Sequence, residues 1–164
     1  MLYLLDADVL IRADRTFYPP GNFPTFWDWL AHMGNLGNVK IPREQYEEIT
    51  TGTGPLVDWL KREDVKRSLL LNEDAVPALV ADVTANGYGP LDETGLEKVG
   101  KDPFLIAYAY ANRADRTVVT LEVSAPRRQG ANRKIPDVCN GLGVPCCDLF
   151  QLITVLDFRT DWRR

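Results

Sequence analysis

Short apolar runs alternate with longer segments of helical periodicity along this chain. The apolar runs predict strands at residues 2–5, just before Pro42, and at 67–71, 117–121 and 144–149. Apolar positions at helical spacing predict helices at 23–33, 43–50, 55–64, 72–89, 102–113, 135–143 and 150–158. Strands that alternate with helices in this way are typical of a parallel sheet covered by helices on both faces. The pattern therefore predicts the α/β fold class.

Capping residues indicate where some of these helices begin. Asp102 is expected to cap the helix that follows it, with Pro103 at the first helical position. Asn72 is expected to cap the helix that ends near residue 89. The polar, glycine-containing segment 92–101 is expected to be an irregular connection.

Length and composition set broad limits on the protein. The 164 residues predict a single domain, residues 1–164, and the apolar fraction of 45% is typical of soluble globular proteins. A net charge of −4 argues against a surface that binds nucleic acid throughout, but it allows a local basic patch. No apolar stretch approaches the ~20 residues of a membrane helix. The N-terminus has no secretory signal, so no contact with a membrane is expected.

Cysteine and histidine usage narrows the chemistry. Cys139, Cys146 and Cys147 do not have the spacing of a zinc site, and we expect reduced thiols in a cytoplasmic protein. His32 is the single histidine. A histidine-based nucleophilic triad or a histidine-rich zinc site therefore has almost no residues from which to form.

Acidic residues stand where the predicted strands and helices meet. Asp6 directly follows the first strand, and Glu122 follows the strand at 117–121. Asp102 begins a helix that leads into that strand, and Glu48 lies on the helix after Pro42. Because the carboxyl ends of parallel strands share one edge, these acids are expected to meet there.

A cluster of carboxylates needs a positive partner. Asp8 adds a further acid two residues after Asp6, and desolvated like charges repel. Oxygen ligands of this kind suit Mg²⁺ or Mn²⁺. Such an ion lowers the pKa of a bound water and neutralises charge on a phosphodiester. The cluster therefore points to phosphodiester hydrolysis.

Six phrases of the chain resemble those of a known family. "YLLDADVLI", "IPREQYEEI", "KDPFLIAYA" and "VVTLE" resemble the ordered acidic motifs of PIN-domain proteins, which include the VapC-type toxin ribonucleases. "FYPPGNFPTFWDWL" and "KIPDVCNGLGVPC" are similar to phrases of an uncharacterised PIN-like family. The resemblance implies a three-layer α/β/α sandwich with a central, mainly parallel sheet. It also implies an endoribonuclease dependent on Mg²⁺ or Mn²⁺, a toxin with a partner antitoxin, and a homodimer.

The resemblance also assigns roles to individual acids. The catalytic and metal-binding residues that it implies are Asp6, Glu48, Asp102 and Glu122. Glu122 is one methylene longer than the aspartate that is common at its position. Asp8 stands where the family more often has a neutral hydrogen-bonding residue. Asp8 and Asp137 are secondary candidates.

Two further features concern the surroundings of the cluster. Glu47 competes with Glu48, but on a helix the two side chains point about 100° apart, so only one faces the site. The basic loop "APRRQGANRK" follows Glu122 and is expected to bind RNA phosphates. Its four cationic residues are Arg127, Arg128, Arg133 and Lys134.

Two alternatives stay open at this point. "LLDADVL" also matches the first motif of haloacid-dehalogenase-like phosphatases, in which Asp6 would be the nucleophile and Asp8 the acid/base. Thr120 would then belong to their second motif, but nothing after it supplies the later acidic pair. The second alternative is a catalytically inactive PIN-like binding module.

Overall fold

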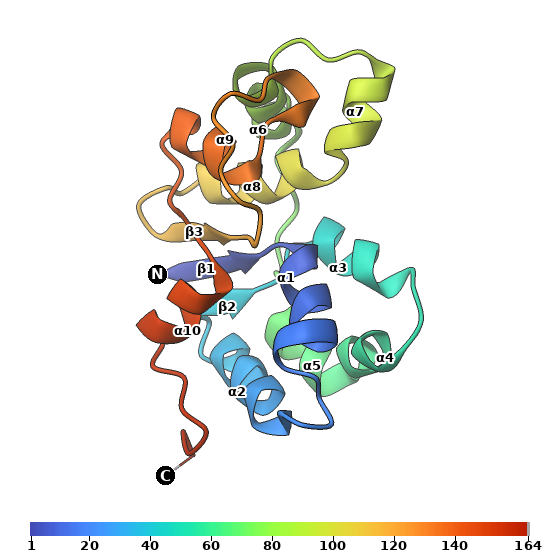
Figure 1. The fold of residues 1–164 in the computed structure, drawn as a ribbon, viewed down its shortest axis with the longest axis vertical. Coiled ribbons are helices and arrows are strands. Elements are labelled where there is room, and N and C mark those ends of the chain that lie inside the picture. Colours follow the sequence, from blue (N-terminus) through green and yellow to red (C-terminus); the bar gives the residue numbers. More distant parts are fainter. Residues whose placement is uncertain (164) are drawn as a thin grey trace.

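A four-stranded parallel sheet forms the centre of the protein (Figure 1). The computed structural model describes residues 1–163. Within them the strand order is β2-β1-β3-β4. The strands are β1 (Leu2–Leu5), β2 (Val39–Lys40), β3 (Arg116–Val119) and β4 (Cys146–Cys147). Strands near residues 2–5, Pro42, 117–121 and 144–149 are thus confirmed.

The register of the sheet aligns the carboxyl ends of its two central strands. Leu5 of β1 pairs with Val119 of β3, and Val119 pairs in turn with Cys147 of β4. The residues that follow, Asp6 and Thr120, therefore leave the sheet side by side. This edge is where ligands bind in open parallel sheets.

Helices cover both faces of the sheet, as Figure 1 shows. One layer contains α1 (Ala7–Arg12), α2 (Pro24–Asn35), α3 (Arg43–Thr50), α4 (Pro55–Lys61), α5 (Glu63–Leu69) and α10 (Leu149–Val155). The other contains α6 (Pro77–Asp82), α7 (Glu93–Val99), α8 (Asp102–Tyr110) and α9 (Ile135–Leu142). The protein is therefore a three-layer α/β/α sandwich, as expected.

Alternation along the strands divides the apolar interior into two cores. Leu5 and Val119 pack in the core of the α1–α5 and α10 layer. Leu4 and Val118 pack in the core of the α6–α9 layer. Successive strand residues point to opposite faces, so a sheet covered on both sides needs fully apolar strands. No helix within residues 1–163 is long and apolar enough to cross a membrane.

The predicted strand at residues 67–71 is wrong. Helix α5 continues to Leu69, and only an isolated bridge joins Leu70 to Ile41. The helix has acidic residues in its first turn and basic residues in its last, which suits the helix dipole. The backbone becomes extended only at Leu70, directly after the helix.

One unpredicted helix and two wrong helix caps are further differences from the expected structure. Segment 92–101 is not an irregular connection, because it contains α7, capped by Asp92, which accepts the N–H of Gly95 at 2.8 Å. Asn72 caps nothing, since α6 begins only at Pro77 and then passes into the π-helical turn Val83–Tyr88. Asp102 is the first residue of α8 rather than its cap.

Candidate functional site

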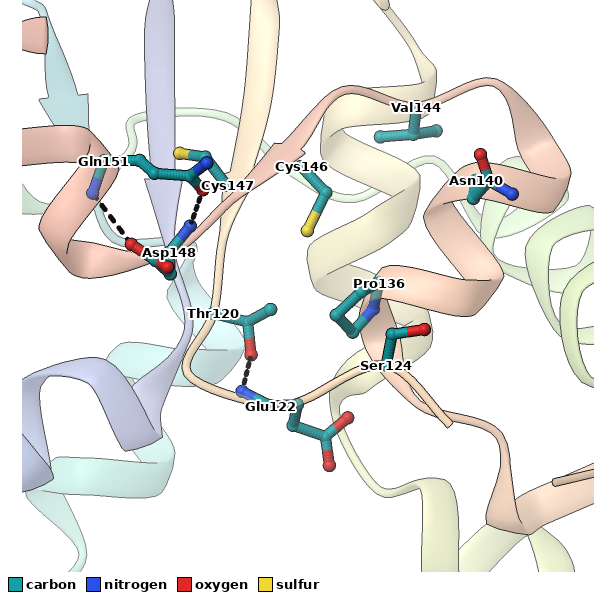
Figure 2. Close-up of a pocket in the computed structure, with 10 residues that line it drawn as sticks. All are labelled: Thr120, Glu122, Ser124, Pro136, Asn140, Val144, Cys146, Cys147, Asp148 and Gln151. Atoms are coloured by element: carbon teal, nitrogen blue, oxygen red, sulfur yellow. Dashed lines mark hydrogen bonds between the residues drawn. The ribbon is translucent and has the colours of Figure 1, made fainter. Parts of the chain in front are cut away.

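Asp6 is the most deeply buried acid of the site. Its backbone N–H donates to the Val119 carbonyl at 2.9 Å, which extends the β1–β3 pairing by one residue. Asp6 is only 7% exposed, and its carboxylate accepts a hydrogen bond at 2.9 Å from the Thr120 hydroxyl. The same hydroxyl oxygen accepts the N–H of Glu122 at 3.2 Å (Figure 2). Strand pairing therefore sets the orientation of the Asp6 carboxylate.

The surroundings of Asp6 favour its neutral form. Burial raises the pKa of Asp6 to about 6, although the hydrogen bond from Thr120 acts in the opposite direction. The charges of Asp8, Glu48 and Glu122 contribute to this rise after burial. Acids from three other places in the chain are thus close enough to act electrostatically on Asp6.

Asp102 is the second acid of the site. Its pKa is raised to about 8, first by burial and then by the charges of Asp6, Glu122 and Glu48, whereas the charge of Lys134 acts in the opposite direction. Its side chain does not cap α8, which leaves the carboxylate available. The start of α8 is held in turn by Gln45, whose side-chain amide donates to the Lys101 carbonyl at 2.9 Å.

Glu48, not Glu47, is the residue of α3 that acts on the cluster. The charge of Glu48 raises the pKa of both Asp6 and Asp102, and Glu47 contributes to neither. Glu48 lies on the exposed side of α3. Partial desolvation raises its own pKa, Lys101 lowers it and Asp8 raises it.

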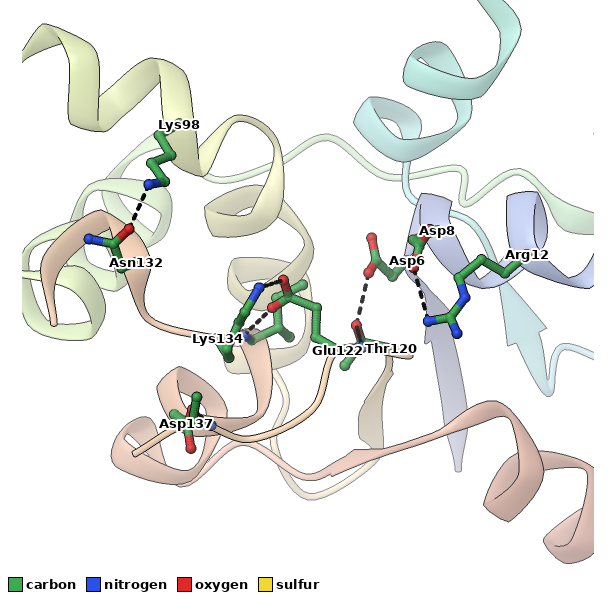
Figure 3. A network of polar contacts seen from close by, with 11 residues as sticks. Asp6, Asp8, Arg12, Lys98, Thr120, Glu122, Asn132, Lys134 and Asp137 are labelled. Carbon is green, nitrogen blue, oxygen red and sulfur yellow. Dashed lines mark hydrogen bonds and ion pairs between the residues drawn. The ribbon is translucent and has the colours of Figure 1, made fainter. Parts of the chain in front are cut away.

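Glu122 is close to the cluster, but its carboxylate is already occupied. One oxygen accepts a hydrogen bond from Lys134 Nζ at 2.6 Å, and the other accepts the Ile135 N–H at 2.8 Å (Figure 3). The two side chains of the ion pair are 25% and 29% exposed. The charge of Glu122 therefore acts on Asp6 and Asp102, but both of its carboxylate oxygens already accept hydrogen bonds from Lys134 and Ile135.

The two secondary candidates differ. Asp8 lies on α1, half-exposed, 3.7 Å from the guanidinium of Arg12, and its charge acts on Asp6. Asp137 acts on neither Asp6 nor Asp102 and lies apart from Asp6 in Figure 3. Its carboxylate accepts hydrogen bonds from the Ser124 hydroxyl and the Ala125 N–H. The structure therefore corrects its role to that of an anchor for the basic loop.

The four cations of the basic loop fall into two pairs. Lys134 binds Glu122, and Arg133 donates to the backbone carbonyls of Gly87 and Asp137. These two residues hold the base of the loop, so their expected role in binding RNA needs correction. Arg127 and Arg128 are exposed and form no hydrogen bond or ion pair through their side chains with any residue from 1 to 163.

One family matches the sequence over nearly its whole length. The family described as "Domain of unknown function (DUF4411)" matches residues 3–160. The chain belongs to the DUF4411 family. The match includes all four acids of the cluster, and its description assigns no activity. Searches of curated proteins and of solved structures each found no match.

The donor chemistry of this DUF4411 chain suits a hard divalent cation. The clustered side chains are all carboxylates, which are ligands that Mg²⁺ and Mn²⁺ prefer. However, no group of three or more His, Cys, Asp or Glu side chains within residues 1–163 is close enough together to hold a metal ion. Glu122, held by Lys134 and Ile135, is one reason. The acids are close enough for their charges to act on Asp102, but within residues 1–163 no three of them are close enough to share one ion.

Tyr88 is a member of the DUF4411 site that the sequence did not reveal. It ends the π-helical turn after α6, is 3% exposed, and its hydroxyl has no hydrogen-bond partner within residues 1–163. Burial and then the charge of Asp102 raise the pKa of this phenol. Helical periodicity carries no signal for a hydroxyl placed by a π-turn. The group is available to a water or ligand at the cluster.

Tyr88→Phe is expected to keep the fold and to raise the free energy of unfolding by about 1 kcal/mol, because a buried hydroxyl without a partner is costly. Urea denaturation of the metal-free protein measures this. The matched control is Tyr46→Phe, which removes a hydroxyl that donates to the Leu60 carbonyl at 3.0 Å, and it is expected to destabilise. Equal destabilisation by both variants would contradict the assignment.

Two cavities adjoin the cluster in the DUF4411 fold. One, of about 330 Å³, is lined by Glu122 together with Pro136, Asn140 and Cys146 (Figure 2). The other, of about 490 Å³, is lined by Glu48, Arg15 and the 51–54 loop. Both volumes are in the range of ligand sites. Open space therefore lies beside Glu122 and beside Glu48, whereas Asp6 and Asp102 line neither of these two cavities.

Proposed function

We propose that this DUF4411 protein is a metal-dependent endoribonuclease that hydrolyses RNA phosphodiesters with Mg²⁺ or Mn²⁺. One observation carries the proposal: acids from four separate segments lie at one edge of the sheet, where Asp6, Glu48 and Glu122 all raise the pKa of the buried Asp102. The metal ligands we propose are Asp6, Glu48, Asp102 and Glu122.

The energetics of the cluster favour a bound cation. Asp6 and Asp102 are desolvated, and neighbouring acids raise the pKa of both, whereas Lys134 lowers that of Asp102. Desolvated carboxylates are stabilised by a paired charge or by a metal. The chemistry that a bound divalent ion supplies is activation of a water molecule and neutralisation of charge on the phosphodiester.

Neighbouring residues orient the Asp6 and Asp102 segments of the site, and Asp102 holds a proton that it can release. Thr120 fixes the rotation of the Asp6 carboxylate, and the Gln45 contact holds the end of α8 that carries Asp102. A pKa of about 8 means that Asp102 holds a proton at neutral pH in the metal-free protein. Loading the site with a cation must therefore release protons.

The acids alone repel RNA, so positive charge is needed close by. Arg127 and Arg128, at the exposed part of the loop anchored by Glu122 and Asp137, supply it. Phosphate contacts of this kind position a nucleic acid without reading its sequence.

The Arg127→Ala/Arg128→Ala double variant is expected to bind RNA about tenfold more weakly and to lower the salt dependence of log K by between about 1 and 2. Its stability is expected to be unchanged, because neither side chain has a partner in residues 1–163. Fluorescence anisotropy at several salt concentrations measures both effects. Arg67→Ala, which removes an exposed charge from α5, is the control. An unchanged salt slope would exclude this loop from the RNA site.

The biological setting is proposed from the PIN-like motifs alone. Their order and the phrases that flank them support a cytoplasmic toxin of the VapC type, which forms a homodimer and pairs with an antitoxin. A small DNA-binding protein encoded beside this chain would support the pairing.

The decisive experiment is cleavage of total RNA with and without Mg²⁺ or Mn²⁺. Cleavage that requires the metal and disappears on adding EDTA supports the proposal. Trapping of a phosphoaspartate mimic at Asp6 with fluoroberyllate would favour the phosphatase alternative. RNA binding without cleavage under any metal condition would favour an inactive binding module.

A further inference from the structure

The Lys134–Glu122 ion pair lies at the edge of the carboxylate cluster rather than on an unrelated surface. The two groups are 2.6 Å apart, and both side chains are about three-quarters buried. Lys134 also acts on Asp102, whose pKa it lowers. The ammonium group is therefore a positive charge inside the electrostatic range of the proposed metal site.

The ion pair and a neighbouring backbone contact together occupy both carboxylate oxygens of Glu122. One carboxylate oxygen accepts from Lys134 Nζ, and the other accepts from the Ile135 N–H. Lys134 directly precedes α9, so both contacts come from adjacent positions of one chain segment. As long as these bonds persist, Glu122 is turned toward the start of α9 (Figure 3).

We propose that Lys134 is an internal counter-ion that holds Glu122 out of the metal site and releases it when a divalent cation binds. The inference rests on the proposed function, because it concerns the same site. It accounts for why both carboxylate oxygens of Glu122 are bound elsewhere although its charge acts on Asp102.

The inference separates Lys134 from a merely structural ion pair. A partly exposed pair contributes little to stability, and a structural role predicts only that small loss. A counter-ion predicts in addition a change in cation affinity, because the metal must displace Lys134 from Glu122. The affinity for Mn²⁺ is therefore the informative measurement, and it needs no catalytic activity.

The experiment is isothermal titration of Mn²⁺ into the full-length chain. Lys134→Met is expected to bind Mn²⁺ about tenfold more tightly than the wild type, which corresponds to about 1.4 kcal/mol. Glu122→Gln is expected to bind more weakly, and in the Lys134→Met/Glu122→Gln double variant the gain is expected to vanish. Lys134→Gln, which keeps a hydrogen-bond donor for Glu122, provides a second test if Lys134→Met does not fold. The control is Lys98→Met, which removes a nearby lysine that binds Asn132 instead.

The outcomes distinguish the inference from the function on which it rests. Equal or weaker binding by Lys134→Met, with metal-dependent RNA cleavage by the wild type, overturns the counter-ion role and leaves the proposed function standing. A gain that persists in the double variant also overturns it, because the effect would then not pass through Glu122. No Mn²⁺ binding by any variant, together with no cleavage, overturns both.

Discussion

Asp6→Asn is expected to lower the rate of RNA cleavage at saturating Mn²⁺ by at least about 10³-fold, and Asp102→Asn is expected to do the same. Both carboxylates are proposed ligands, and a metal ion contributes several kcal/mol of charge stabilisation, with about 1.4 kcal/mol for each factor of ten. Asparagine keeps the shape of Asp6 and can still accept the Thr120 hydrogen bond. The loss is therefore one of charge rather than of packing.

The matched control is Glu47→Gln. It makes the same change of charge on α3, one residue from Glu48, but at a carboxylate that acts on neither Asp6 nor Asp102. Its cleavage rate is expected to stay within about twofold of the wild type, since it has no part in transition-state stabilisation. Cleavage by Asp6→Asn at the wild-type rate would refute metal catalysis at this cluster. If the protein is instead a phosphatase with Asp6 as its nucleophile, the Asp6→Asn variant would no longer trap fluoroberyllate.

The metal-free protein is expected to lose stability as pH rises from 5 to 9, by on the order of 5 kcal/mol. The pKa of Asp6 is about 6 and that of Asp102 about 8, both above the ordinary aspartate value, because of burial and neighbouring acids. The folded state therefore holds protons that the unfolded chain releases near pH 4. The stability contributed by these protons is fully present below pH 4 and is lost as pH rises through 6 and 8.

Urea denaturation in EDTA across this pH range measures the effect. Asp102→Asn is expected to flatten the profile, because the group with the larger rise in pKa no longer titrates. Addition of Mn²⁺ is expected to stabilise the wild type more at pH 8 than at pH 5, since protons compete with the metal for the same oxygens. A metal-free profile that rises from pH 5 to 9 would show that these acids are not buried as a cluster.

The chain order of the acids was informative because parallel strands end at a common edge. Asp6 and Glu122 were expected together on that ground, and the register of β1 and β3 places the residues after Leu5 and Val119 side by side. Asp102 and Glu48 were expected nearby from the helices that lead to and from the strands. The choice of Glu48 over Glu47 needed the orientation of α3.

The polar partners of the site were beyond sequence reasoning. The sequence suggested Asp137 as a secondary acid of the cluster and Arg133 as an RNA contact, but in the structure both anchor the basic loop. Glu122 was expected to be a metal ligand, but its carboxylate accepts a hydrogen bond from Lys134. Each of these contacts spans a loop whose path depends on packing, and a polar residue in a loop has no periodicity that predicts its partner.

By itself the sequence determined the α/β class, the parallel sheet and the order of acids along it. These follow from local patterns: apolar strands, amphipathic helices and residues at strand ends. Only the tertiary structure decided that Tyr88 is buried at the cluster, that α7 and the end of α5 are helical, and that Lys134 neutralises Glu122. Burial and long-range hydrogen bonds are properties of the packed chain, and they set which acids keep their charge.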